Sequence, residues 1–177
     1  QWKQAAALLK RLEAGEPLQY LLQEWDFYGR TFQVGEGVLI PRSDTETLVS
    51  VALEELSAFR EPVVLDLCAG SGCIGITMAL ESPTASVTAV ELSEDAFSYL
   101  TKNNALFDSP VTAVLGDALT YQHPEPVHMI VSNPPYIPTK DLAGLQKEVQ
   151  KEPVLALDGG EDGLYFYREL AKRGNSL

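Results

Sequence analysis

Short apolar runs alternate with predicted helices through most of this chain. Four near-continuous runs are typical of strands buried on both faces of a parallel sheet: residues 62–67, 86–91, 111–115 and 127–131. One helix is expected from Cys73 to about Glu81. A second helix is expected to begin with Ser93 as its N-cap and to run to about Phe107. The β-α-β-α-β order predicts an α/β fold with a doubly wound, mostly parallel, Rossmann-like sheet and right-handed crossovers.

The pattern divides the chain into three units. Residues 1–24 contain a short helix over residues 3–14, which we interpret as the end of an N-terminal helical domain. Residues 25–42 are rich in aromatic and β-branched residues and predict a connecting strand pair that turns at Gly29-Arg30. Residues 43–177 form the α/β domain.

Two further helices are expected in the α/β domain. Ser43 and Glu46 have the spacing of a capping box, which predicts a helix that begins there and runs to about Phe59. After the last strand comes a loop-rich segment. A final helix is then predicted to open at residues 161–163 and to run to about Lys172.

A glycine-rich turn follows the first strand of the predicted sheet. Residues 70–75 fit the G-x-G-x-x-G fingerprint, in which glycines let the backbone approach a ligand closely. Glu91 stands about twenty residues further on, at the end of the second strand, where a ribose-binding carboxylate belongs. Asp66, at the end of the first strand, can take an amino group of a ligand. The turn alone favours an NAD enzyme and an S-adenosylmethionine enzyme equally.

The exit of the fourth strand carries the sequence Asn133-Pro134-Pro135-Tyr136. Prolines have no N–H and cannot continue a ladder, so the chain must leave the sheet where open α/β sheets bind ligands. The stiff loop offers an amide, free carbonyls and a π face, which together form a cradle for a planar NH₂ group. An NAD enzyme has no use for this loop. The stretch resembles the signature of methyltransferases that use S-adenosylmethionine to methylate amide or exocyclic amino nitrogens.

An ordered set of motifs makes the resemblance more specific. The chain is similar to the HemK/PrmC family of release-factor glutamine methyltransferases from Glu16 onward. The segments that carry the similarity are residues 16–21, 27–30, 39–46, 65–74, 133–137 and 152–164. The resemblance implies the fold of class I S-adenosylmethionine-dependent methyltransferases and methyl transfer to a glutamine amide. It also implies further helices before residue 1 and further strands after residue 177, so the chain is expected to be incomplete.

The resemblance also implies roles for individual residues. The cofactor S-adenosylmethionine, with S-adenosylhomocysteine as its product, is expected to contact Asp66, Cys68, Ala69, Gly70, Ser71, Gly72, Glu91, Asp117, Ala118 and Asn133. The catalytic and substrate-binding residues are expected to be Asn133, Pro134, Pro135 and Tyr136. Within these groups, Glu91 would hold the ribose, and Asp117 and Ala118 would sit beside the adenine. Cys68 stands where methyltransferase turns often have glycine.

Composition and charge limit the kinds of partner that the protein is expected to bind. Hydrophobic residues make up 45% of the 177 residues, and no apolar run reaches the length of a membrane span, so we expect no membrane association. The net charge is −12 and the 13 Lys and Arg are scattered, which disfavours nucleic acid and favours a basic protein partner such as a release factor. We expect a monomer.

The positions of the two cysteines indicate the redox compartment and argue against a metal site. Cys68 and Cys73 lie in one apolar stretch and are interpreted as small core residues in a reducing, cytoplasmic compartment. Two cysteines are too few for a metal site, and the two histidines are far away, so no metal is expected.

Two other functions remain open at the level of sequence. A DNA or RNA amino-methyltransferase would use the same Asn-Pro-Pro-Tyr logic on a flipped base. A non-catalytic module would keep the fold and dock a partner. Cofactor binding separates the module from both enzymes, and a release factor offered against a DNA duplex separates the enzymes.

Overall fold

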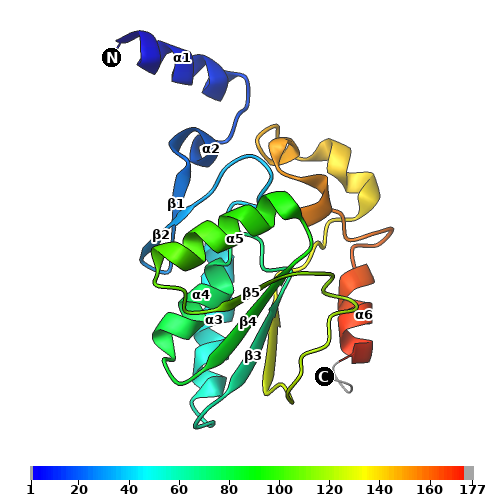
Figure 1. The fold of residues 1–177 in the computed structure, drawn as a ribbon. Coiled ribbons are helices and arrows are strands. Elements are labelled where there is room, and N and C mark those ends of the chain that lie inside the picture. The colour runs from blue at the N-terminus through cyan, green and yellow to red at the C-terminus, as the bar shows by residue number, and fades with distance from the viewer. Residues whose placement is uncertain (1, 174–177) are drawn as a thin grey trace.

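A four-stranded parallel sheet forms the centre of the molecule (Figure 1). The computed structural model describes residues 2–173; residues 1 and 174–177, at the outer ends of the first and third predicted units, lie outside the described residues. The strands run in the order β5-β4-β3-β6: β5 (Thr112–Leu115), β4 (Ser86–Glu91), β3 (Val63–Leu67) and β6 (Met129–Ser132). All five positions of β3 are buried, as the apolar run predicts. The predicted α/β fold is confirmed.

Helices cover the two faces of the sheet unequally. One face carries α3 (Ser43–Leu56), α4 (Cys73–Glu81) and α5 (Glu94–Leu106), and the largest buried cluster lies between these helices and the strands. The opposite face packs on α6 (Tyr165–Arg173), whose Leu170 contacts a smaller cluster around Leu65 and Leu67 (Figure 1). Both faces are therefore covered, as expected for a parallel sheet.

The N-terminal part begins with α1 (Trp2–Glu13) and α2 (Leu18–Leu22), followed by a hairpin of β1 (Glu24–Phe27) and β2 (Arg30–Gln33). The hairpin turns at Tyr28 and Gly29, with φ angles of 52° and 70°, so the prediction of a turn at Gly29-Arg30 was wrong by one residue. Positive φ at both central positions is the requirement of a type I′ turn.

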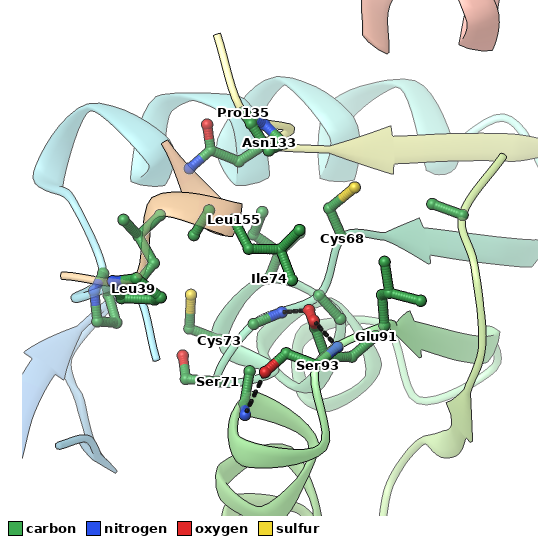
Figure 2. Close-up of a pocket in the computed structure, with 18 of the residues that line it drawn as sticks. Leu39, Cys68, Ser71, Cys73, Ile74, Glu91, Ser93, Asn133, Pro135 and Leu155 are labelled. Carbon is green, nitrogen blue, oxygen red and sulfur yellow. Dashed lines mark hydrogen bonds between the residues drawn. The ribbon is translucent and has the colours of Figure 1, made fainter. Parts of the chain in front are cut away.

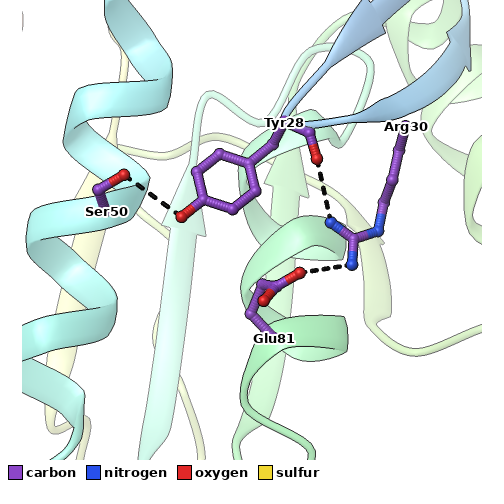
Figure 3. Close-up of polar contacts among 4 residues, drawn as sticks. All are labelled: Tyr28, Arg30, Ser50 and Glu81. Carbon is purple, nitrogen blue, oxygen red and sulfur yellow. Dashed lines mark hydrogen bonds and ion pairs between the residues drawn. The ribbon is translucent and has the colours of Figure 1, made fainter.

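Side chains of the hairpin hold it against two helices. Arg30 pairs with Glu81 at the end of α4 and also donates to the Tyr28 carbonyl, while the Tyr28 hydroxyl reaches Ser50 of α3 (Figure 3). Glu46 Oε1 accepts from the Tyr28 N–H at 2.8 Å. These contacts stabilise a backbone conformation that tyrosine rarely adopts.

The capping box predicted at Ser43 and Glu46 was wrong. Arg42 occupies the N-cap position of α3, without a side-chain hydrogen bond, and the Glu46 carboxylate is used by the hairpin instead. The helix also ends at Leu56 rather than Phe59. The N-cap at Ser93 is confirmed, since its side chain accepts from Ala96 N at 3.3 Å.

The segment between β6 and α6 contains three 3₁₀ helices, η1 (Thr139–Gly144), η2 (Val149–Lys151) and η3 (Val154–Ala156). Residues 161–163, predicted to open the last helix, lie in a turn, and the helix begins at Tyr165. Gly163 has a φ of 77°, which does not fit a right-handed helix.

Candidate active site

A cavity opens beside the carboxyl ends of β3, β4 and β6 and encloses about 890 Å³, including solvent at its mouth. In Figure 2, Glu91 and Ser93 lie on one side of it, and Asn133 and Pro135 lie on the other. Eight of the ten residues predicted to contact a cofactor line it: Cys68, Ala69, Gly70, Ser71, Glu91, Asp117, Ala118 and Asn133. Asp66 and Gly72 do not line it.

Glu91 organises the glycine turn from the end of the neighbouring strand. Its Oε2 accepts from Gly70 N at 2.7 Å and its Oε1 accepts from Ser93 N at 2.8 Å (Figure 2). The residue is 8% exposed and lines the cavity. Because each carboxylate oxygen has two lone pairs, both oxygens can still accept from a ligand hydroxyl.

Asp66 lies beneath the turn and is fully buried. Its Oδ2 accepts from Gly75 N at 2.8 Å, while Oδ1 has no hydrogen-bond partner among the residues that the structure describes. Burial raises the pKa of this carboxyl to about 7; the Gly75 hydrogen bond opposes the rise and the charge of Glu91 adds to it. An unpartnered buried acceptor is costly unless a donor reaches it.

Gly72 has a packing role in the turn. It is the N-cap of α4 with a φ of 81°, and a Cβ there would collide with the side chains of Leu100 and Ile76. The second glycine of the fingerprint therefore allows α4 and α5 to pack against the turn, and it does not face the cavity.

The two cysteines that line the cavity are protonated at neutral pH. Burial, and next the charge of Glu91, raises the pKa of the Cys68 thiol to about 12. Burial likewise raises the pKa of Cys73 to about 12. Neither thiol is therefore an activated nucleophile. Cys68 has a φ of 61°, so a non-glycine residue occupies a left-handed position in the turn.

A second cavity of about 600 Å³ lies next to the first and is bordered by Pro134 and Tyr136. The two cavities share Leu39, Arg42, Asn133 and Ala156. Asn133 therefore lies where they meet. The structure brings the predicted loop residues together, but it divides them between two spaces: Pro135 borders the first, and Pro134 and Tyr136 border the second.

Two segments far apart in sequence, residues 37–42 and 153–157, contribute to the walls of both cavities. Glu152, whose side chain is 2% exposed, joins them. Its Oε2 accepts from Ile40 N at 2.9 Å and its Oε1 pairs with Arg42 at 2.5 Å. Sequence analysis assigned no role to Glu152, although Glu152 and both of its partners lie in segments that carry the family resemblance.

Asn103 was also missed. This fully buried residue of α5 accepts from Gln33 N at 2.7 Å and donates to the carbonyls of Gln33 and Ser71. It thereby ties the hairpin to the glycine turn. The available signal was a polar residue on the apolar face of a predicted helix, which needs partners when buried.

The described residues contain neither a membrane-spanning helix nor a cluster of metal ligands. Among residues 2–173, no helix is both long and apolar enough to cross a membrane. Within the same described part, no group of three or more His, Cys, Asp or Glu side chains could hold a metal ion.

Several solved structures have a similar fold. The hMettl16 catalytic domain, in complex with an RNA hairpin of the MAT2A 3′UTR, superposes with a TM-score of 0.67 at 13% identity, covering 97% of this chain and 72% of that one. Trm5b from Pyrococcus abyssi gives a TM-score of 0.52 at 18% identity, covering 87% and 47%. At these identities the likeness shows the fold alone, and that fold is the class I S-adenosylmethionine-dependent methyltransferase fold.

The sequence profile of the methyltransferase small domain family matches residues 43–156, and the chain belongs to this family. The match includes the glycine turn, Glu91 and the Asn-Pro-Pro-Tyr loop.

Curated relatives carry a more specific name. The release factor glutamine methyltransferase of Thermodesulfovibrio yellowstonii is 40% identical, covering 93% of this chain and 60% of that protein. The enzyme of the same name from Geobacter sulfurreducens is 45% identical, covering 91% and 56%. The predicted resemblance is confirmed. The chain spans about 60% of the length of these relatives.

Proposed function

We propose that the protein transfers a methyl group from S-adenosylmethionine to the side-chain amide nitrogen of a glutamine in peptide-chain release factors. The observation that carries this proposal is the position of Asn133 at the junction of the two cavities. A methyl donor in the first cavity and an amide in the second would meet there. The relatives named for this reaction support the choice of substrate.

The first cavity has the chemistry that S-adenosylmethionine requires. Glu91 keeps free lone pairs for the ribose hydroxyls. The orphaned Oδ1 of Asp66 would accept from the amino group through water, because Asp66 itself does not line the cavity. Asp117 and Ala118 would border the adenine. The cofactor supplies a methyl group made electrophilic by its sulfonium.

The Asn-Pro-Pro-Tyr loop would orient the acceptor. The amide nitrogen of glutamine is a weak nucleophile because its lone pair is delocalised into the carbonyl. Asn133 Oδ1 and the Pro134 carbonyl would accept the two N–H bonds, which holds the nitrogen toward the methyl group and favours the charge that develops there. Tyr136 would pack against the glutamine side chain. The proton would leave to water after transfer.

We further propose that the protein acts as a cytoplasmic monomer on a basic protein substrate, since a net charge of −12 favours such a partner. Residues 1–24 would be the end of a helical domain, residues 25–42 the connecting strand pair, and residues 43–177 the methyltransferase domain, completed by further chain in the whole protein. The relatives' greater length supports this division.

The test is methyl transfer by the whole protein, with calorimetry of S-adenosylmethionine binding as a separate measurement. We expect methylation of a release factor and none of a DNA duplex or an RNA hairpin. Methylation of nucleic acid alone would identify an amino-methyltransferase of the other class. Absence of cofactor binding would leave only a docking module.

A further inference from the structure

We infer that Gly159 and Gly163 are positioning residues that set the Asn-Pro-Pro-Tyr loop for reaction, an inference that rests on the proposed function. Both lie in the segment Asp158–Leu164, to which neither the glycine turn nor the proposed chemistry gives a role. The segment packs against the backbone of Tyr136, the last residue of the loop.

Backbone hydrogen bonds join the two segments in register. Ile137 N donates to Leu157 O at 2.9 Å, Gly159 N donates to Ile137 O at 2.8 Å, and a parallel bridge pairs Ile137 with Asp158. Next along the chain, Thr139 N donates to Gly160 O at 2.9 Å. The chain directly after Tyr136 is therefore fixed to residues 157–160 and not to the central sheet.

The Asp158 side chain reinforces this pairing. Its Oδ1 accepts from Thr139 Oγ1 at 2.7 Å and from Gly160 N at 3.0 Å, so one oxygen bridges the two segments. The hydrogen bond from Thr139, and next the one from Gly160, lowers the pKa of this carboxyl. Asp158 therefore remains charged at neutral pH and keeps the bridge.

The glycines are required because the Tyr136 backbone lies directly against them. A Cβ on Gly159 would lie 2.7 Å from Tyr136 Cα and 2.8 Å from its carbonyl carbon. A Cβ on Gly163 would collide with the Tyr136 carbonyl oxygen and lie 3.2 Å from Pro138 Cδ. Backbone atoms cannot move aside as the end of a flexible side chain can, so either Cβ would force Tyr136 and the segment Asp158–Leu164 apart; the Gly159 Cβ would also lie 2.9 Å from Gly163 Cα.

That displacement would affect the acceptor side of the site and spare the cofactor side. Tyr136 borders the second cavity, whereas neither Gly159 nor Gly163 borders either one. The rigid prolines would pass a shift of Tyr136 back toward Asn133. A positioning role therefore predicts loss of turnover with cofactor affinity retained.

The chain offers a matched control at Gly160. Gly160 and Gly163 have φ angles of 84° and 77°, so alanine carries a similar conformational cost at both. A Cβ on Gly160, however, would meet only the side chain of Tyr165, at 3.2 Å from its Cβ and 3.9 Å from its Cγ, and no atom of Tyr136. Gly159 lacks a positive φ, so Gly159→Ala tests the backbone contact without that cost.

The experiment compares Gly159→Ala, Gly163→Ala and Gly160→Ala in the whole protein. We expect kcat for methyl transfer to a release factor to fall about tenfold or more in the first two, as misplacement by a fraction of an ångström implies. The Kd for S-adenosylmethionine should stay within about twofold of the parent in all three, and Gly160→Ala should keep most of its kcat. If Gly163→Ala does not fold, Gly159→Ala decides.

Hydrogen exchange at the amides of Ile137 and Gly159 provides a readout that does not depend on activity. Both should lose protection in Gly159→Ala and Gly163→Ala and keep it in Gly160→Ala. If the parent protein methylates no release factor, the proposed function is wrong. Hydrogen exchange in the variants would still test the packing of Gly159 and Gly163 against Tyr136. Unchanged exchange in both variants, equal loss of kcat in Gly160→Ala, or a parallel loss of cofactor affinity would overturn the inference.

Discussion

The glycine turn after β3 and the Asn-Pro-Pro-Tyr loop after β6 border one site, but they are held in different ways. The turn is fixed by buried side chains of the next strand and helix, Glu91 and Asn103. The loop is fixed mainly by backbone pairing with residues 157–160, and its Tyr136 is 52% exposed.

Because of this difference, a substitution should disturb the two halves of the proposed site to different extents. The turn, on the proposed cofactor side, belongs to the β-α-β unit that forms the core. The loop, on the proposed acceptor side, depends on residues 157–160, a segment from later in the chain that pairs with it outside the central sheet. We therefore expect substitutions to uncouple cofactor binding from turnover, and the following predictions test that expectation from the largest effect to the smallest.

The largest expected effect concerns Asp66 and stability. An unfolded chain would ionise this carboxyl near pH 3.8, whereas the folded protein keeps its proton to about pH 7. Between these values the folded state binds more protons, so this group's contribution to the free energy of unfolding falls as pH rises. Relative to the parent, Asp66→Asn should therefore gain stability across this window, by as much as about 4 kcal/mol.

Urea unfolding of both proteins without cofactor, at several pH values from 4 to 8, measures this gain. Asp158→Asn is the matched control on the acceptor side. Hydrogen bonds lower the pKa of Asp158 below its ordinary 3.8, so its contribution to stability is lost only below that pH, and the difference between Asp158→Asn and the parent should stay nearly constant from pH 4 to 8. Parallel stability curves for the parent and Asp66→Asn would show that the carboxyl ionises normally in the folded protein.

The second prediction removes the side chain at the junction of the cavities. Asn133→Ala should lower turnover by about 10²-fold or more, the size seen when one positioned polar group is lost from an active site. Release-factor binding should change far less. Single-turnover methyl transfer, with binding measured separately, checks the split.

Asn133→Asp sharpens this test, because it keeps an acceptor and nearly the same shape while adding a negative charge. Some activity should survive in Asn133→Asp, and Asn133→Ala should be worse. Near-normal turnover in the alanine variant would mean that the loop is only a stiff turn and that the reaction occurs elsewhere.

The third prediction concerns the residue proposed to bind the ribose of the cofactor. Glu91→Ala should weaken S-adenosylmethionine binding by about 1–3 kcal/mol, because ribose hydroxyls and the Gly70 N–H lose their acceptor. Turnover at saturating cofactor should suffer less than in Asn133→Ala, since the acceptor loop has other anchors. Calorimetry that gives an unchanged affinity would refute the assignment of Glu91 to the ribose.

The smallest effect is expected at Cys68. Replacement by glycine removes the cost of a side chain at a φ of 61° but frees the unfolded chain, so stability should change by less than about 1 kcal/mol. Because the thiol pKa is about 12, the pH–rate profiles of Cys68→Gly and the parent should coincide from pH 6 to 9. A titration near pH 8 present only in the parent would show an ionising thiol.

The sequence by itself determined the β-α-β-α-β architecture and most of the predicted residues that line the first cavity. Apolar runs placed all four strands of the central sheet to within two residues, because a parallel sheet requires continuous burial. Glu91 and the glycine turn could be identified because their spacing follows from one local unit, in which a turn after one strand meets the end of the next.

Only the tertiary structure decided which residues support the Asn-Pro-Pro-Tyr loop. The bridge from Glu152 to Ile40 and Arg42 joins residues more than 100 positions apart. The contact of Gly159 and Gly163 with Tyr136 likewise depends on how a loop-rich segment folds back. Periodicity and turn propensity describe only a residue's near neighbours along the chain. Contacts between distant segments are set by packing of the whole molecule, and no pattern in either segment encodes them.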